Sequence, residues 1–223
     1  MAIELHQVEP HSHLRLVRYS FANPIAAAVD AVVASVDPSS AVTVGTALTQ
    51  ATAFANNITF RHARRVTLVL TDASGGAGGL SVSVVISGHR FGKALQETLT
   101  VTCTDGSATT GTSSFAYDAI SSIVPAAVTS AGAGDALTMG VTADLGLPHP
   151  IDAVTDVQLI YKVVSGNVET IIAPSSTTVD VVNDRSMLVH GTTITKANDV
   201  FEVQFFKSLK QDAPGCGNRG AFA

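Results

Sequence analysis

The sequence contains no tryptophan, and both aromatic and charged side chains are scarce. Of its 223 residues, 5% are aromatic and 14% are charged, whereas an ordinary domain carries about 25% charged residues. Sugar-binding platforms rely on exposed aromatic rings, above all tryptophan, so the composition disfavours a carbohydrate-binding protein. The surface must consist largely of Thr, Ser, Gly and Ala, which bring few hydrated charges that resist desolvation. This composition suits a protein that works while pressed against neighbouring molecules.

The chain also lacks the patterns of nucleic-acid-binding, membrane and secreted proteins. Its 13 basic residues are outnumbered by 18 acidic ones, and a dedicated nucleic-acid binder normally has a concentrated basic surface. No run of about 18 apolar residues is present to span a bilayer. The N-terminal segment MAIELHQVEPHSHLRLVRYS has no apolar region typical of a secretory signal. We therefore expect a soluble protein that is made in a cytoplasm and contacts neither membranes nor nucleic acid directly.

Motifs for catalysis and cofactor binding are missing as well. Cys103 and Cys216 lie far apart in the sequence and in no metal-binding spacing, so both are expected to be reduced thiols. No Gly-x-Ser-x-Gly motif stands between a strand and a helix, the five glutamates are scattered, and no calcium-binding loop is present. A Ser-His-Asp site assembled from distant segments is an alternative that the sequence leaves open. We predict that the protein is not an enzyme and carries no cofactor.

Two segments resemble ligand sites at first sight. The glycine-rich stretch ASGGAGG at 73–79 is followed by another strand pattern, whereas a phosphate-binding loop is followed by a helix, so we interpret it as a hairpin turn. His6, His11 and His13 lie close together near the N-terminus, but a zinc site needs three or four ligands with supporting contacts. We favour an arm that is solvated or contacts a neighbouring subunit over a metal site.

From about residue 41 onward, apolar residues recur at every second position. In LSVSVVI (80–86) apolar residues alternate with serines, and in LQETLTVTC (95–103) they alternate with threonines, as expected of strands with one exposed face. Short strands separated by turn-forming residues predict a mainly β fold, an antiparallel β-sandwich or sandwich-like barrel. The other predicted strands are 66–70, 136–141, 156–164, 168–173, 177–182 and 199–206.

One segment near the N-terminus has helical rather than strand periodicity. Its apolar residues recur near every 3.6 positions, and Pro38 follows as a stop signal. We therefore predict at most one short helix, at about 24–36. The ends of the chain show no regular pattern, so we expect them to form extended arms. The predicted domain plan is an N-terminal arm at 1–22, a β-sandwich domain at 23–207 with a possible sub-boundary near 146–152, and a C-terminal tail at 208–223.

The densest cluster of positive charge, FRHARR at 60–65, contains Arg61, His62, Arg64 and Arg65 and leads into a predicted strand. Strand alternation would place Arg61 and Arg65 on the same side. Such a patch could dock onto acidic groups of a partner, since the planar guanidinium pairs well with carboxylates; an ordinary solvated strand end is the alternative. The predicted partner interface also includes basic and histidine residues near the two ends of the chain: His11, His13, Arg15, Arg18, Lys207, Lys210 and Arg219.

The ordered string of motifs resembles a family of tailed-bacteriophage virion proteins. The similarity rests on ITFRHARRVTLVLTDASGGAGGLSVSVVISGHRFGKALQETLTVT, SSFAYDAISSIVPA and GAGDALTMGVTADLGLPHPI, and it extends to the later VTDVQLIYKVV and DVFEVQFF. It covers about residues 40–206. Members of this family are small, β-rich and often encoded near the major capsid protein, and some are presumed capsid decoration (cement) proteins. The shared motifs are structural and carry no catalytic signature.

The resemblance implies a structural role on the outside of the virion capsid. The expected partners are the major capsid protein lattice and further copies of the chain, arranged as a trimer in closed symmetry. The expected effect is to stabilise the assembled capsid against internal pressure. A tail-tube or neck protein is the alternative within the virion, and a carbohydrate-binding or adhesin β-sandwich is the alternative outside it.

Overall fold

The computed structural model shows a mainly β protein whose antiparallel sheets pack against each other as a sandwich, as predicted. The described part of the chain contains no α-helix, and a 3-10 turn covers Val154–Asp156. The structure describes residues 14–22, 27–51, 58–73, 79–149, 151, 153–164, 167–181, 187–188 and 199–208.

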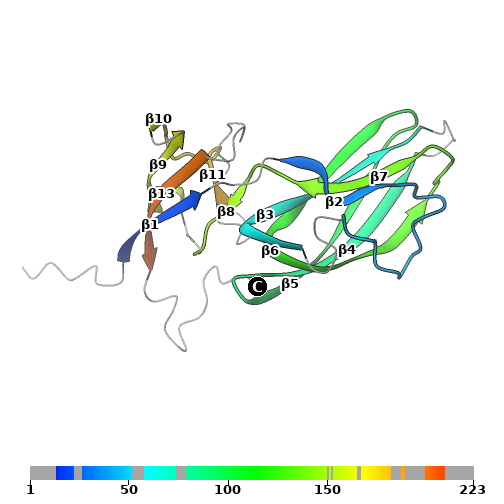
Figure 1. Ribbon diagram of the computed structural model, residues 1–223, viewed down its shortest axis with the longest axis horizontal. Coiled ribbons are helices and arrows are strands. Elements are labelled where there is room, and N and C mark those ends of the chain that lie inside the picture. Colours follow the sequence, from blue (N-terminus) through cyan, green and yellow to red (C-terminus); the bar gives the residue numbers. More distant parts are fainter. Residues whose placement is uncertain are drawn as a thin grey trace, which may run out of the picture.

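The strands form three sheets (Figure 1). The largest has the strand order β2-β7-β3-β6-β4-β5, the second has the order β1-β13-β9-β10, and a small one has the order β11-β12-β8. The strands are β1 Leu14–Ala22, β2 Ala28–Val36, β3 Ile58–Thr71, β4 Ser81–Arg90, β5 Lys93–Thr102, β6 Ala108–Thr129, β7 Ala136–Val141, β8 Leu145–Gly146, β9 Val157–Val164, β10 Asn167–Ile172, β11 Val179–Asp180, β12 Met187–Leu188 and β13 Asp199–Ser208.

Strand β6 belongs to both layers of the largest sheet. Residues 108–120 of this 22-residue strand pair with β3, whereas residues 119–129 pair with β4. Register shifts interrupt the pairing with β3 between Thr59 and Thr67. A strand that changes sheets through such irregularities forms a corner between packed layers. One layer is therefore β2, β7, β3 and the first part of β6, and the other is the second part of β6 with β4 and β5.

Apolar side chains from both layers meet in one core. Every second residue of β3 from Val66 to Leu70 is buried, as is every second residue of β4 from Val82 to Ile86. A side chain added at Gly111 of β6 would collide with Val101 of β5, so the layers are in direct contact there. Burial of each Val, Leu or Ile contributes about 1.5–3 kcal/mol relative to exposure. The hydrophobic effect on these residues therefore holds the layers together.

A second core lies between the β1-β13-β9-β10 sheet and the short strands β8, β11 and β12. Phe201, Val203 and Phe205 are alternate residues of β13 and are all fully buried. They belong to one cluster with Phe21 of β1 and Leu145 of β8. The molecule thus has a larger half, built on β2 to β7, and a smaller half, built on β1 and β8 to β13. Figure 1 shows the two halves at opposite ends of the molecule, with β8 between them.

The helix predicted at about 24–36 is wrong, because Ala28–Val36 form strand β2. Val33 lies opposite Met139 of β7, and both Val32 and Val33 are fully buried. Branched valine side chains lose rotamer freedom in a helix and pack well in a sheet. Register shifts along this pairing allow two consecutive valines to face inward. The resulting apolar spacing imitates that of a helix.

Two further segments differ from the prediction. Residues 14–22, which the sequence indicates as part of an irregular arm, form β1, and this strand pairs along its whole length with β13. Phe21 of β1 is fully buried, so the strand is stabilised by residues near the other end of the chain. Strand β6 begins at Ala108, inside the stretch TDGSATTGT (104–112), whose composition is typical of a turn. In both segments the stabilising partner is distant in sequence, and local periodicity does not reveal it.

Candidate functional site

The predicted arginine cluster on β3 is divided between the surface and the interior. Arg61 is exposed and Arg65 is partly exposed, whereas His62 and Arg64 are buried. The register shift between Thr59 and Arg64 interrupts the pairing with β6. The shift breaks the regular alternation of side chains along the strand. The prediction that Arg61 and Arg65 lie on the same side depends on that alternation. The four residues therefore do not form one surface patch.

His62 and Arg64 face the junction, where β3, β4 and β6 of the larger half contact β1 and residues 143–147. His62 Nε2 forms a hydrogen bond with the carbonyl oxygen of Ala22 at 3.0 Å, and Arg64 Nη1 donates to the carbonyl oxygen of Ala143 at 3.4 Å. Burial lowers the pKa of His62, and it lowers the pKa of Arg64 to about 10. Both side chains hold backbone of the smaller half and are not presented to an outside partner.

A second buried arginine and a close backbone approach complete the junction. Arg90, at the end of β4, is fully buried and donates from Nη2 to the carbonyl oxygen of Leu147 at 3.0 Å. A Cβ atom added at Gly146 of β8 would lie 2.7 Å from the Cβ of Ala63 and 3.3 Å from that of Ala116. Small residues therefore allow β8 to approach β3 and β6 closely, and the arginines bind the flanking carbonyl groups. The junction is a structural contact between the halves.

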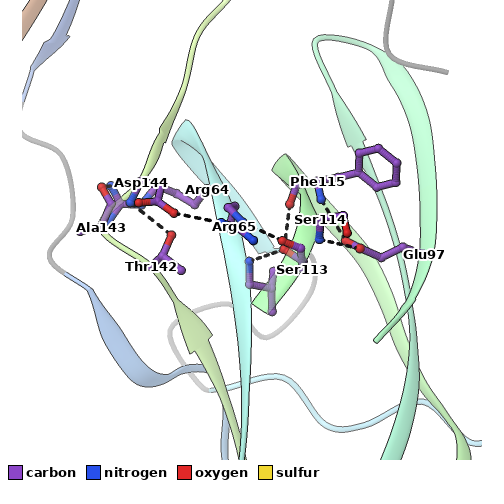
Figure 2. A network of polar contacts seen from close by, with 10 residues as sticks. Arg64, Arg65, Glu97, Ser113, Ser114, Phe115, Thr142, Ala143 and Asp144 are labelled. Carbon is purple, nitrogen blue, oxygen red and sulfur yellow. Dashed lines mark hydrogen bonds and ion pairs between the residues drawn. The ribbon is translucent and has the colours of Figure 1, made fainter. Parts of the chain in front are cut away.

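Arg65 belongs to a polar network around Ser113 and Asp144 (Figure 2). It donates from Nε to the carbonyl oxygen of Ser113 at 2.7 Å and forms an ion pair with Asp144 at 3.5 Å. The Ser113 hydroxyl accepts a hydrogen bond from the Val66 N–H at 2.8 Å and donates to the carbonyl oxygen of Phe115 at 2.8 Å. Buried backbone groups need such partners where ladder pairing is interrupted. Arg65 therefore supports the passage of β6 between the layers.

Glu97 of β5 lies on the other side of the same network (Figure 2). Its carboxylate accepts hydrogen bonds from the Ser114 N–H at 2.7 Å and from the Tyr117 hydroxyl at 2.8 Å. Burial, together with the nearby charge of Glu97, raises the pKa of Tyr117, so the phenol stays a neutral donor. Glu97 therefore ties β5 to β6 through a backbone amide and a phenol.

The structure brings three of the predicted terminal interface residues to one sheet. Arg18 of β1 forms an ion pair with Glu202 of β13 and donates to the Tyr161 hydroxyl of β9 at 2.7 Å, and Tyr161 in turn donates to Glu202. The Arg18 side chain is 62% exposed. Arg15 and Lys207 are backbone partners across β1 and β13. The other predicted interface residues lie outside the described residues: His11, His13, Lys210 and Arg219.

The described residues contain no assembled site for metal binding or thiol chemistry. No group of three or more His, Cys, Asp or Glu side chains there is placed to hold a metal ion. The same part of the chain includes no helix with the length and apolar character needed to cross a membrane. Cys103 is buried, and burial raises the pKa of its thiol, so Cys103 serves as a packing residue. His6 and Cys216 lie outside the described residues.

The outer face of β4, β5 and the second part of β6 carries no Asp, Glu, Lys or Arg side chain, and the imidazole of His89 lies at its margin, next to the end of β4. Directly opposite residues of an antiparallel pair share a face, so the register defines this surface. Two cross-strand hydroxyl pairs lie on it, Ser81 with Thr102 at 2.8 Å and Ser83 with Thr100 at 2.7 Å. We call it the neutral face, and it consists of Ser81, Ser83, Val85 and Ser87 on β4, Gln96, Thr98, Thr100 and Thr102 on β5, and Ser122, Val124, Ala127 and Thr129 on β6.

Comparisons of the chain with protein-family models, curated proteins and solved structures found no match. The surfaces of the molecule therefore carry the evidence for its function. The junction is occupied by contacts within the chain, whereas the neutral face is available to a partner. The hydroxyl side chains of β4 and β5 are visible in the sequence as an alternating pattern, but the contribution of β6 becomes visible only through its pairing with β4.

Proposed function

We propose that this protein is a non-enzymatic structural component of a tailed-phage virion, a capsid decoration protein that binds the outer capsid lattice. The neutral face is the observation that carries the proposal. The outer face of a solvated antiparallel sheet is ordinarily polar and charged, yet twelve positions across three strands here are hydroxyl, amide or apolar. The sequence resemblance to phage virion proteins points to the same class.

A lattice-binding surface must lose water over its whole contact area. Burial of an unpaired charge costs several kcal/mol, whereas a hydroxyl can exchange a hydrogen bond to water for one to the partner at little net cost. The neutral face has no charge to desolvate, and its hydroxyl groups, such as those of Thr98 and Thr100, both donate and accept. The face can therefore dock without a matching pattern of charges on the lattice.

The neutral face alone is small for a stable contact, so further contacts are part of the proposed mechanism. Three strands about 4.8 Å apart, with about eight residues each, span roughly 300–400 Å², which is about half of the ~800 Å² per partner in a standard interface. Leu14 and Ser208 lie opposite each other at one end of the β1–β13 pair. The points of the sheet from which the segments 1–13 and 209–223 continue are therefore neighbours. In the proposed mechanism these segments contact adjacent capsid subunits.

The proposal is tested by co-sedimentation of the purified protein with isolated capsid shells that lack it. Thr98 and Thr100 are exposed on the neutral face, and T98K or T100K would bury a charge on binding, so each should weaken binding by about tenfold or more. T110K is the matched control, because Thr110 is an exposed strand threonine outside the neutral face. Equal binding by all variants would overturn the role of the neutral face. Failure of the unmodified protein to sediment with shells would overturn the decoration function.

Cryo-electron microscopy of the native virion separates the decoration role from its alternatives. Density for this chain over the outer capsid surface supports the proposal. A stacked ring around the tail, or a ring at the neck, would overturn the decoration role in favour of a tail-tube or neck protein. Absence from the particle combined with a clear signal on a glycan array would identify an adhesin instead.

A further inference from the structure

The four-stranded sheet of the smaller half has one face in the core and one face turned outward. Its inner face packs on the small sheet β11-β12-β8. On the other side, Leu16 of the edge strand β1 is 53% exposed and Ile171 of the edge strand β10 is 70% exposed. Figure 1 shows this sheet at one end of the molecule. We call its outward surface the end face.

The strand register assembles the end face from all four strands. Tyr161 of β9 lies opposite both Glu202 of β13 and Ile171 of β10. Gln204 of β13 lies between Leu159 of β9 and Arg18 of β1. The interacting group of Arg18, Glu202 and Tyr161 thus has apolar residues on either side. Tyrosine and arginine are enriched at the energetic centres of protein interfaces, where a surrounding ring of residues excludes water. The end face has the composition of an interface.

We propose that two copies of the chain associate through their end faces around a two-fold axis. A two-fold contact needs a surface that is complementary to itself, and on the end face the positive side chain of Arg18 and the negative side chain of Glu202 are in direct contact. A two-fold axis close to this ion pair brings Arg18 of each copy toward Glu202 of the other. A partner whose charges are all of one sign would be repelled there by either Arg18 or Glu202. The charges therefore favour a second copy as the occupant.

The size of the end face agrees with a weak but specific pair. Four strands about 4.8 Å apart and six to ten residues long span roughly 400–600 Å². A pair therefore buries roughly 800–1,200 Å² in total, close to the ~1,000 Å² at which specific interfaces begin. We expect a dissociation constant on the order of 10 µM. The pairing does not depend on the virion role, and it differs from the trimer expected from the sequence.

Sedimentation velocity of the full chain over about 1–200 µM, a range that brackets the expected dissociation constant, tests the pairing. The unmodified protein should shift from its 22.9-kDa monomer to a species of twice that mass. I171K should raise the dissociation constant by about tenfold or more, because it places a lysine where an apolar side chain becomes buried. V29K is the matched control, since Val29 is 61% exposed on β2, an edge strand of the larger half. V29K should leave the pairing unchanged.

Charge exchange tests the two-fold geometry separately. R18E and E202R each leave like charges facing each other across the axis and should weaken the pair, whereas the double variant R18E/E202R should recover it. Thermal unfolding of each variant, at a concentration where the unmodified protein is monomeric, shows that the fold is retained. A monomer over the whole range, a trimer, or equal effects of I171K and V29K would each overturn the proposal.

Discussion

Replacement of Gly146 by alanine tests how closely the two halves are held at the junction. The added Cβ atom would lie 2.7 Å from the Cβ of Ala63, whereas carbon atoms in contact prefer about 3.5–4.0 Å. Both atoms are fixed to backbone and cannot rotate away, so β8 and β3 have to separate. Overpacking of this kind costs about 1–3 kcal/mol, and alanine regains about 0.5–1 kcal/mol over glycine within a strand. We expect G146A to lower the free energy of unfolding by about 1–2 kcal/mol.

Urea unfolding followed by far-ultraviolet circular dichroism measures this loss. With a denaturant dependence of about 2 kcal/mol per molar urea, the midpoint should fall by about 0.5–1 M. A63G removes the atom that the new side chain meets, so the double variant A63G/G146A should show a favourable coupling of about 1 kcal/mol between the two sites. A G146A protein as stable as the original, or a loss that A63G does not reduce, would refute the close approach of β8 to β3.

Two further predictions concern pH and the ends of the chain. Burial lowers the pKa of His62 in the folded protein below its ordinary value of about 6.5. As the pH falls, the unfolded chain therefore takes up a proton at this residue before the folded protein does. The free energy of unfolding decreases below about pH 7 until folded His62 is itself protonated. H62Q should flatten this part of the profile in urea unfolding at a series of pH values; parallel profiles would contradict the assignment. Deletion of 1–13 or of 209–223 should weaken binding to capsid shells without changing the circular dichroism spectrum, because β1 and β13 remain complete. Full binding by both truncated proteins would contradict a role for these segments.

The strands with one buried and one exposed face could be predicted from the sequence. In β4 and β5 the alternation of apolar residues with serine or threonine follows directly from the two-residue period of a strand, and the structure places both strands where the pattern indicates. The predicted strand at 136–141 coincides with β7. These segments carry their own signal because one of their faces is buried and the other is not.

The remaining features depend on contacts between distant parts of the chain. Val32 and Val33 face inward together because β2 pairs irregularly with β7, and no window of local sequence shows that pairing. Arg64 and Arg90 look like surface charges in the sequence, yet both are buried against backbone carbonyl groups of the smaller half. The neutral face and the end face likewise exist only once the register brings separate strands together. Local patterns therefore identify the strands but not the surfaces.

The continuity of β6 through both layers has a mechanical consequence. A pull on the β4–β5 hairpin reaches β3 and β7 along one unbroken peptide backbone, so the load does not have to pass through side-chain contacts between the layers. To pull β4 and β5 away from β3 and β7, a force would have to rupture the hydrogen-bond ladder on one part of β6 or the other. Under tension, the larger half is therefore held by a hydrogen-bond ladder as well as by its core.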